Sequence, residues 1–363
     1  MAPLSPREPI PVLIAGVGGG GHGAQILKAL QLAETPYEII GCDMSPMGLS
    51  LRTVAHRYLV PPANSEEYLP AVLHLCEKHA VKAVFHGSEP DLKSLARCRE
   101  EFSRRGILLP INRQSVLDIC FDKVKTFEFL ASKGFSVPFY RKMVSMEEVS
   151  SIDTFPVVAK PSVGSGGSAY LYLIQDHDEL MLAAKQMFSH FPEFVVQEYF
   201  GRPEDEYTVG VLHDLDGGFI NSVAVRRQIM SGLSNRVRAR NRTKCDNLGP
   251  VLAISSGISQ GEIGLFSEVT GPCEEIAAAL DSAGPINIQC RRVGDEIKVF
   301  EINPRFSGTT SLRAMAGYNE PDILIRKHLR GESIPVRFEY KSGFISRGLC
   351  ETFSETLEFP QAI

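Results

Sequence analysis

Oxygen-bearing side chains alternate with apolar ones in the segment 299–303. A strand's two-residue period would place Glu301 and Asn303 on one face and their apolar neighbours on the other. The segment 286–290 alternates in the same way, and a turn centred on Gly294 would create the pairs 287–301 and 289–299. Directly paired residues share a face of a sheet. The predicted face therefore combines four side chains: Asn287, Gln289, Glu301 and Asn303.

Such a face suits a hard divalent cation. Mg²⁺ prefers oxygen ligands such as carboxylates and amides, and phosphates and waters usually fill its remaining positions. Arg305 follows the strand and could neutralise phosphoryl oxygens. The alternative is a solvated face, but such a face would favour Lys, Glu and Thr over amides with a single acid.

Lys160 ends an apolar strand pattern, and a loop rich in glycine and serine separates it from the next strand pattern. Backbone N–H groups of such a loop can point at phosphate oxygens, because no side chain obstructs them. The loop is not a Walker A motif, since no Gly-Lys-Ser/Thr closes it. An ordinary flexible hairpin is the alternative. The loop residues are Gly164, Ser165, Gly166, Gly167 and Ser168.

A second glycine-rich loop, residues 16–23, follows the first strand pattern and opens a helix pattern. Gly16, Gly18 and Gly21 satisfy G-x-G-x-x-G, and Asp43 ends the next strand pattern, so a nicotinamide dinucleotide site is one interpretation. A tight strand-to-helix turn that needs small residues is the other. A single fingerprint is weak evidence, and we expect nicotinamide cofactors not to bind here.

Seven basic residues and no acid occur in the segment 226–244 of a chain whose net charge is −5. The segment could be a solvated loop, a pocket for an anionic substrate or a nucleic-acid patch. The absence of aromatic residues disfavours the last of these. In a strand, Arg236, Arg238 and Arg240 would share one face.

The elements that would position these residues fall into two groups. Strand and helix patterns alternate over about the first 115 residues, which predicts a parallel sheet with helices on both faces. The expected strands there are 11–16, 38–43, 83–86 and 106–110, and the expected helices are 24–32, 68–79 and 91–104. Beyond residue 112 we expect helices at 115–133, 178–189, 267–283 and 321–330, and strands at 156–160, 169–173, 194–198, 207–212, 219–226, 286–290 and 297–302. The tail from residue 339 is weakly patterned.

Composition narrows the class of protein. The 363 residues are 44% apolar and 22% charged, a globular balance with room for two or three packed units. A near balance of 38 basic and 43 acidic residues argues against a nucleic-acid partner, and no apolar run reaches the ~18 residues of a membrane span. The apolar stretch near the N-terminus has no basic region ahead of it, so we predict no signal peptide. Eight Cys without a CxxC pair favour free thiols in a cytoplasmic protein, and the nine His form no zinc-type motif.

Taken together, these motifs resemble the ATP-grasp superfamily in order and spacing, most closely the branch of the carbamoyl phosphate synthase large subunit. The resemblance rests on Lys123, on Lys160 with its loop, on Gln197-Glu198-Tyr199-Phe200, on Glu206, on Gln289 and on the segment 301–305. It implies an α/β Rossmann-like N-terminal domain (1–114) followed by a two-lobed α+β ATP-grasp fold. The implied small lobe is 115–197, the large lobe is 198–335, and the tail is 336–363.

The resemblance also implies roles. Lys123 and Lys160 would contact the phosphates of ATP, and the loop 164–168 would close over them. Glu198, Tyr199 and Phe200 would form the hinge that holds adenine, and Glu206 would bind the ribose. Gln289, Glu301 and Asn303 would hold one or two Mg²⁺ ions, which Mn²⁺ could replace, while Arg305 and Lys160 would act in catalysis. The resemblance makes Gly18, Gly19 and Glu89 expected substrate contacts, and the charge of the segment 226–244 adds Arg227, Arg236 and Arg238 to them.

The activity implied is that of an ATP-dependent carboxylate–amine ligase. ATP would phosphorylate a small-molecule carboxylate, and an amine would displace phosphate from the acyl-phosphate to give an amide. The chain departs from carbamoyl phosphate synthases in having one ATP-grasp unit instead of two and no glutaminase segment. The alternatives are an enzyme that phosphorylates bicarbonate, an NAD-dependent oxidoreductase that uses the loop 16–23, and a catalytically silent nucleotide-binding regulator. Dimers are common among such ligases, so a homodimer is also an open expectation.

Overall fold

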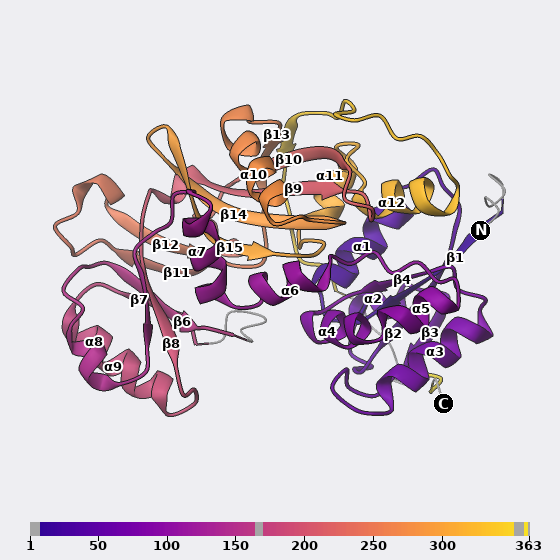
Figure 1. Cartoon of the computed structure of the whole chain (residues 1–363), viewed down its shortest axis with the longest axis horizontal. Coiled ribbons are helices and arrows are strands. Elements are labelled where there is room, and N and C mark those ends of the chain that lie inside the picture. Colours follow the sequence, from indigo (N-terminus) through magenta and orange to yellow (C-terminus); the bar gives the residue numbers. More distant parts are fainter. Residues whose placement is uncertain (1–7, 164–169, 352–358, 362–363) are drawn as a thin grey trace.

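The computed structural model describes residues 8–163, 170–351 and 359–361, which form three packed parts (Figure 1). The loop residues 164–168, expected to cover the phosphates, lie outside the described residues. No helix in the described ranges is both long enough and apolar enough to cross a membrane.

The N-terminal part is a parallel sheet in the order β3-β2-β1-β4. Its strands are β1 (Ile10–Ala15), β2 (Tyr37–Asp43), β3 (His56–Leu59) and β4 (Ala83–His86). Val12 and Ile14 pack on one side of the sheet in a core that includes α1, whereas Leu13 and Ala15 pack on the other side with α3 and α4. The helices are α1 (His22–Gln31), α2 (Leu49–Arg52), α3 (Tyr68–Lys78), α4 (Glu89–Arg97) and α5 (Arg99–Arg104).

Two expectations for this part are wrong. The segment 106–110 forms only an isolated bridge, Ala83 with Leu108, because Gly106 turns the chain with a φ of +67° and Pro110 has no N–H for a ladder. The helix expected over 91–104 is two helices that meet at Cys98. The sequence pattern also did not predict β3, a four-residue strand at the edge of the sheet.

The second part is a small antiparallel sheet in the order β5-β8-β6-β7. The helix expected over 115–133 breaks before Lys123, because the Asp122 side chain accepts hydrogen bonds from the N–H groups of Val124 and Lys125 and starts a new helix there. The elements are α6 (Gln114–Cys120), α7 (Lys123–Ser132), β5 (Tyr140–Met143), α8 (Met146–Ser150), β6 (Val157–Pro161), β7 (Tyr172–Ile174), α9 (His177–Phe188) and β8 (Phe194–Glu198).

The third part is a large antiparallel sheet in the order β15-β14-β9-β10-β13-β16. Its strands are β9 (Glu206–His213), β10 (Phe219–Arg227), β13 (Gly261–Gly264), β14 (Pro285–Val293), β15 (Glu296–Asn303) and β16 (Gly343–Ile345). A separate hairpin joins β11 (Asn235–Arg240) to β12 (Val251–Ser255). The helices are η1 (Pro203–Asp205), η2 (Asp246–Leu248), α10 (Ser267–Ala279), α11 (Thr310–Met315) and α12 (Glu320–Leu329).

The N-terminal part and the large sheet share one hydrophobic core. Leu27 and Leu30 of α1 are buried in the same cluster as Leu324 of α12 and Phe306, and the ring of Phe306 lies 5.7 Å from that of Phe85 on β4. Figure 1 shows α1 beside α11 and α12, beneath the large sheet. The carboxyl end of β4 is thereby fixed next to the residues that follow β15.

Candidate active site

A pocket of about 270 Å³ lies where the small sheet faces the large sheet. Most of the predicted site residues line it, although they come from segments more than 200 positions apart. The predicted residues in its wall are Glu89, Lys123, Lys160, Glu198, Tyr199, Phe200, Glu206, Arg227, Arg236, Gln289, Glu301, Asn303 and Arg305. Gly18, Gly19 and Arg238 are not among the residues that line it.

The predicted oxygen-bearing face exists, but the predicted register is wrong. Asn287 pairs with Asn303 and Gln289 with Glu301, whereas on the turn side Cys290 pairs with Val299. Phe300 is therefore an extra residue, a β-bulge. Had the turn-side register continued, Gln289 would lie opposite Phe300, so the bulge is what brings Glu301 across from Gln289.

The bulge also provides a partner for a lysine. Lys160 is buried at the end of β6, and its Nζ donates a hydrogen bond to the Phe300 carbonyl at 3.1 Å. Burial, followed by the neighbouring charge of Lys123, lowers the pKa of Lys160 to about 7, and Glu301 opposes this shift. Burial likewise lowers the pKa of Lys123. Two desolvated lysines beside the carboxylates of Glu301 and Glu89 form a site that an anionic ligand would stabilise.

Glu301 and Asn303 are each held by a neighbour. The Gln289 Nε2 donates to the Glu301 Oε2 at 2.7 Å, and the Arg305 Nη2 donates to the Asn303 Oδ1 at 2.9 Å. Burial lowers the pKa of Arg305, and Glu301 and Glu89 oppose this shift. The Gln289 Oε1 accepts a hydrogen bond from Arg227 at 3.4 Å, so this oxygen points away from Glu301. The side-chain amide would have to flip before Oε1 could bind a metal ion beside Glu301. Its role as a ligand stays a prediction.

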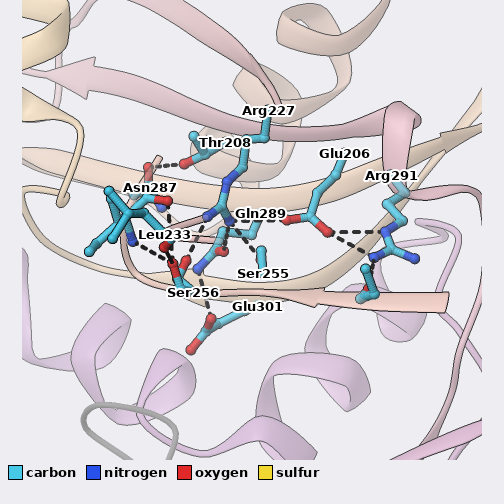
Figure 2. A network of polar contacts seen from close by, with 12 residues as sticks. Glu206, Thr208, Arg227, Leu233, Ser255, Ser256, Asn287, Gln289, Arg291 and Glu301 are labelled. Atoms are coloured by element: carbon cyan, nitrogen blue, oxygen red, sulfur yellow. Dashed lines mark hydrogen bonds and ion pairs between the residues drawn. The ribbon is translucent and has the colours of Figure 1, made fainter. Parts of the chain in front are cut away.

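Glu206 lies between two arginines, as Figure 2 shows. Its Oε1 accepts a hydrogen bond from Arg227 at 3.0 Å, and its Oε2 accepts bonds from Arg291 at 2.9 and 3.1 Å. Glu206 and Arg227 are 1% and 2% exposed. Both carboxylate oxygens are thus engaged inside the protein, although Oε1 accepts a single bond and keeps a lone pair that could accept from a ribose hydroxyl. Binding of ribose by Glu206 and of substrate by Arg227 stay predictions.

Arg291 is the residue of this network that sequence reasoning missed. Its Nη1 donates to the Phe200 carbonyl at 3.0 Å and its Nη2 to the Ala253 carbonyl at 2.7 Å, so it fixes the expected hinge. The signal was present, because residue 291 follows Gln289 by two positions on β14 and so lies on the same face. An unbroken series of polar contacts therefore runs from Glu301 through Gln289, Arg227, Glu206 and Arg291 to the Phe200 carbonyl.

Asn287 presents an N–H group to the pocket. Its Oδ1 accepts hydrogen bonds from the Thr208 hydroxyl at 2.8 Å and the Arg313 Nη2 at 2.6 Å. Arg313 is fully buried and forms an ion pair with Glu320 at 3.1 Å. Because its oxygen is fixed on that side, Asn287 has its Nδ2 available to donate to an anionic ligand.

The basic residues of the segment 226–244 lie in different surroundings. In β11 the exposed positions alternate and include Arg236, Arg238 and Arg240, but the register with β12 shifts at Arg236. Arg236 lines the wall of the pocket, whereas Arg238 and Arg240 do not, so a common face for the three arginines stays a prediction. Arg242 instead forms ion pairs with Asp176 and Glu179 at the start of α9. Only part of the segment is therefore placed to contact a ligand.

Neighbouring residues of the N-terminal part pack against the glycine loop that follows β1 and hydrogen-bond to it. The Asp43 carboxylate accepts hydrogen bonds from the N–H groups of Gly18 at 2.7 Å and Ser45 at 2.9 Å. A Cβ on Gly18 would lie 2.9 Å from the Cα of Gly48. In the dinucleotide interpretation Asp43 would bind a ribose, but here it holds the loop, which favours the structural turn.

Comparison with solved structures identifies the fold as ATP-grasp. Biotin carboxylase from Campylobacter jejuni superposes with a TM-score of 0.64 over 92% of this chain and 74% of that chain, at 16% identity. N5-carboxyaminoimidazole synthetase from Staphylococcus aureus gives 0.62 over 93% and 81%, also at 16% identity. D-alanine–D-alanine ligase from Bacillus anthracis gives 0.54 over 89% and 98%, at 16% identity. The expected fold class is confirmed.

Comparisons of sequence match two segments of the chain to known families. Residues 12–110 match the family described as PylC-like, N-terminal domain, and residues 255–345 match the family described as ATP-grasp in the biosynthetic pathway with Ter operon. The carbamoyl phosphate synthase large chain of Brucella suis biovar 1 is 24% identical over 94% of this chain. The chain spans 31% of the length of that relative. The resemblance to the ATP-grasp superfamily is thus confirmed.

Proposed function

We propose that the protein is an ATP-dependent carboxylate–amine ligase. The observation that carries the proposal is the pocket in which Glu301 and Asn303 face Lys160 and Arg305 between the two sheets. Oxygen ligands and cationic side chains that line the same pocket fit a polyphosphate with its metal. The solved neighbours, which include ligases that form carbon–nitrogen bonds, support this type of enzyme.

The residues fit Mg²⁺, because the donor set is oxygen only. Glu301 and Asn303 would hold the ion, and Gln289 would join them once its amide turns over. The ion would supply charge neutralisation to the phosphates. Asn303 retains a free lone pair on Oδ1 while it accepts from Arg305.

The protein's own groups would account for the transfer largely by positioning and electrostatics. Lys160 and Lys123 would bind phosphate oxygens, and the ligand charge would keep both protonated. Arg305 would neutralise the oxygens of the transferring phosphoryl group as the carboxylate attacks phosphorus and ADP leaves. The amine would then attack the acyl carbon and release phosphate. The Asn287 Nδ2 is placed to donate to oxygens in this region.

Two measurements on the purified protein test the proposal. Release of ADP is screened over amino acids, dipeptides, hydroxy acids and bicarbonate, each with and without an amine. Hydroxylamine is then used to trap an acyl-phosphate as its hydroxamate. ADP release that needs a carboxylate, together with amide or hydroxamate formation, supports the ligase, whereas binding of ATP without substrate-dependent release contradicts it.

Phosphorylation of bicarbonate is the second candidate, because several curated relatives are carbamoyl phosphate synthase large chains and one solved neighbour is a biotin carboxylase. Bicarbonate alone would then stimulate release of ADP. A homodimer stays a prediction, and light scattering of the purified protein would measure it.

A further inference from the structure

Three potential metal ligands meet on the N-terminal sheet, away from the pocket. They are Glu38 on β2, His56 on β3 and His79, the residue that ends α3. One ligand atom from each lies within 4.8 Å of the other two. The Glu38 Oε1 and His56 Nε2 are 3.2 Å apart, and the two imidazole centroids are 4.9 Å apart.

The topology of the sheet explains why they meet. In the parallel pairing of β2 with β3, Ile40 lies opposite His56, so Glu38 lies two residues earlier on the same face. Helix α3 packs on that face through residues such as Leu75, and its carboxyl end brings His79 there. All three residues lie at the end of the sheet where its parallel strands begin. The loop after β1 and the start of α4 lie at the opposite end, where the strands finish. The cluster is therefore separate from the candidate active site.

A fourth residue orients one of the ligands. The Tyr58 hydroxyl lies 2.9 Å from the His79 Nε2, and Tyr58 is only 8% exposed. Histidines that bind metals usually engage their second ring nitrogen in such a hydrogen bond, which fixes the ring and its tautomer. With Nε2 engaged by Tyr58, the His79 Nδ1 would be the nitrogen that binds the metal.

We propose that Glu38, His56 and His79 form a binding site for a divalent cation of the zinc class. Two imidazoles and one carboxylate favour Zn²⁺, Co²⁺ or Ni²⁺ over Mg²⁺. Ligands bound at about 2.0–2.1 Å in a tetrahedron lie about 3.3 Å apart, close to the separation of the Glu38 and His56 donor atoms. Three protein ligands leave a fourth position for water.

Such an ion would connect segments that are distant in sequence. It would join the start of β2, the edge strand β3 and the end of α3, so it would stabilise the folded N-terminal part by mass action. The site is visible only in three dimensions, because spacings of 18 and 23 residues match no local zinc motif. The sequence alone therefore predicted no zinc site.

The test uses the full-length protein without a histidine tag. Co²⁺ is added to metal-free protein, and the visible absorption bands of tetrahedral Co²⁺ are followed, with Zn²⁺ as the competitor. We expect one equivalent to bind in the presence of excess Mg²⁺. Affinity falls at least about tenfold in His56→Gln and in His79→Gln, because each variant loses one of three ligands. The matched control is His74→Gln, an exposed histidine on the same helix, which should bind like the wild type.

Thermal melts provide the second readout. Zn²⁺ should raise the Tm of the wild type and of His74→Gln, and should leave the Tm of His79→Gln unchanged. The melts without metal show that each variant folds. Absence of the visible bands in the wild type, a thiolate charge-transfer band that indicates cysteine ligands, or unchanged affinity in both His56→Gln and His79→Gln would each overturn the proposal.

Discussion

Glu301 is the carboxylate that lies with Gln289, Asn303 and Arg305 in the pocket. Glu301→Gln should reduce substrate-dependent ADP release at least about 100-fold, because an amide is a poor substitute for the charged ligand of a divalent ion. The Tm should stay close to that of the wild type. The matched control is Glu296→Gln, an exposed residue at the other end of β15, which should retain activity. ADP release by Glu301→Gln at the wild-type rate would disprove the metal assignment.

Lys160 should make the stability of the ligand-free protein depend on pH. Its pKa is about 7 in the folded state and about 10.4 in an unfolded chain, so between these values the unfolded state binds more protons. The free energy of unfolding should therefore rise with pH above 7, by at most about 1.4 kcal/mol per pH unit from this residue.

Urea unfolding of the wild type and of Lys160→Met measures this effect. Between about pH 7 and about pH 8.5 the wild type should gain roughly 1–2 kcal/mol more stability than the variant. Below about pH 6 the two curves should run parallel, since Lys160 is then largely protonated in both states. Parallel curves over the whole range would show that the buried lysine keeps an ordinary pKa.

At the scale of elements, the hairpin of β11 and β12 leads to a prediction about which arginine binds the acid substrate. Arg236 lines the pocket, whereas Arg238, which is also exposed and lies two residues further along β11, does not. Arg236→Gln should raise the KM for the acid roughly 10–100-fold, equivalent to ~1.5–3 kcal/mol for a charged hydrogen bond. The KM for ATP should change less. Arg238→Gln is the control, and equal effects of the two variants would indicate a general effect of charge.

The sequence was sufficient to predict the elements with strong periodicity. It was not sufficient to predict contacts between elements that are far apart along the chain. Alternation placed Gln289, Glu301 and Asn303 on one face, because the side-chain period of a strand is local. It could not reveal the bulge at Phe300, which depends on pairing with β14. Nor could it reveal that Arg313 orients Asn287, since that contact joins residues 26 positions apart. Short elements such as β3 and β13 have too few residues for a periodicity to stand out.

At the scale of the whole molecule, the shared core predicts cooperative unfolding. Side chains of α1 and α12 are buried together, and the Tyr37 hydroxyl donates to Asp322 at 2.6 Å across the same junction. We expect one calorimetric transition for the intact chain. The segment 1–114 expressed alone should unfold without a cooperative transition, because the outer face of α1 would be exposed to water. A cooperative transition of that fragment would show that the predicted boundary at residue 114 separates independent domains.

The bulge at Phe300 affects how relatives of this chain are aligned. Gln289 and Glu301 are paired directly although they are 12 positions apart. A relative with the same turn and a regular strand would keep that pair one position closer in sequence. It would also lack the extra carbonyl that receives Lys160. A one-residue gap in such an alignment therefore belongs at Phe300, because a gap placed at Gly294 would shift residues 295–300 by one position and match Val299 with the relative's counterpart of Lys298.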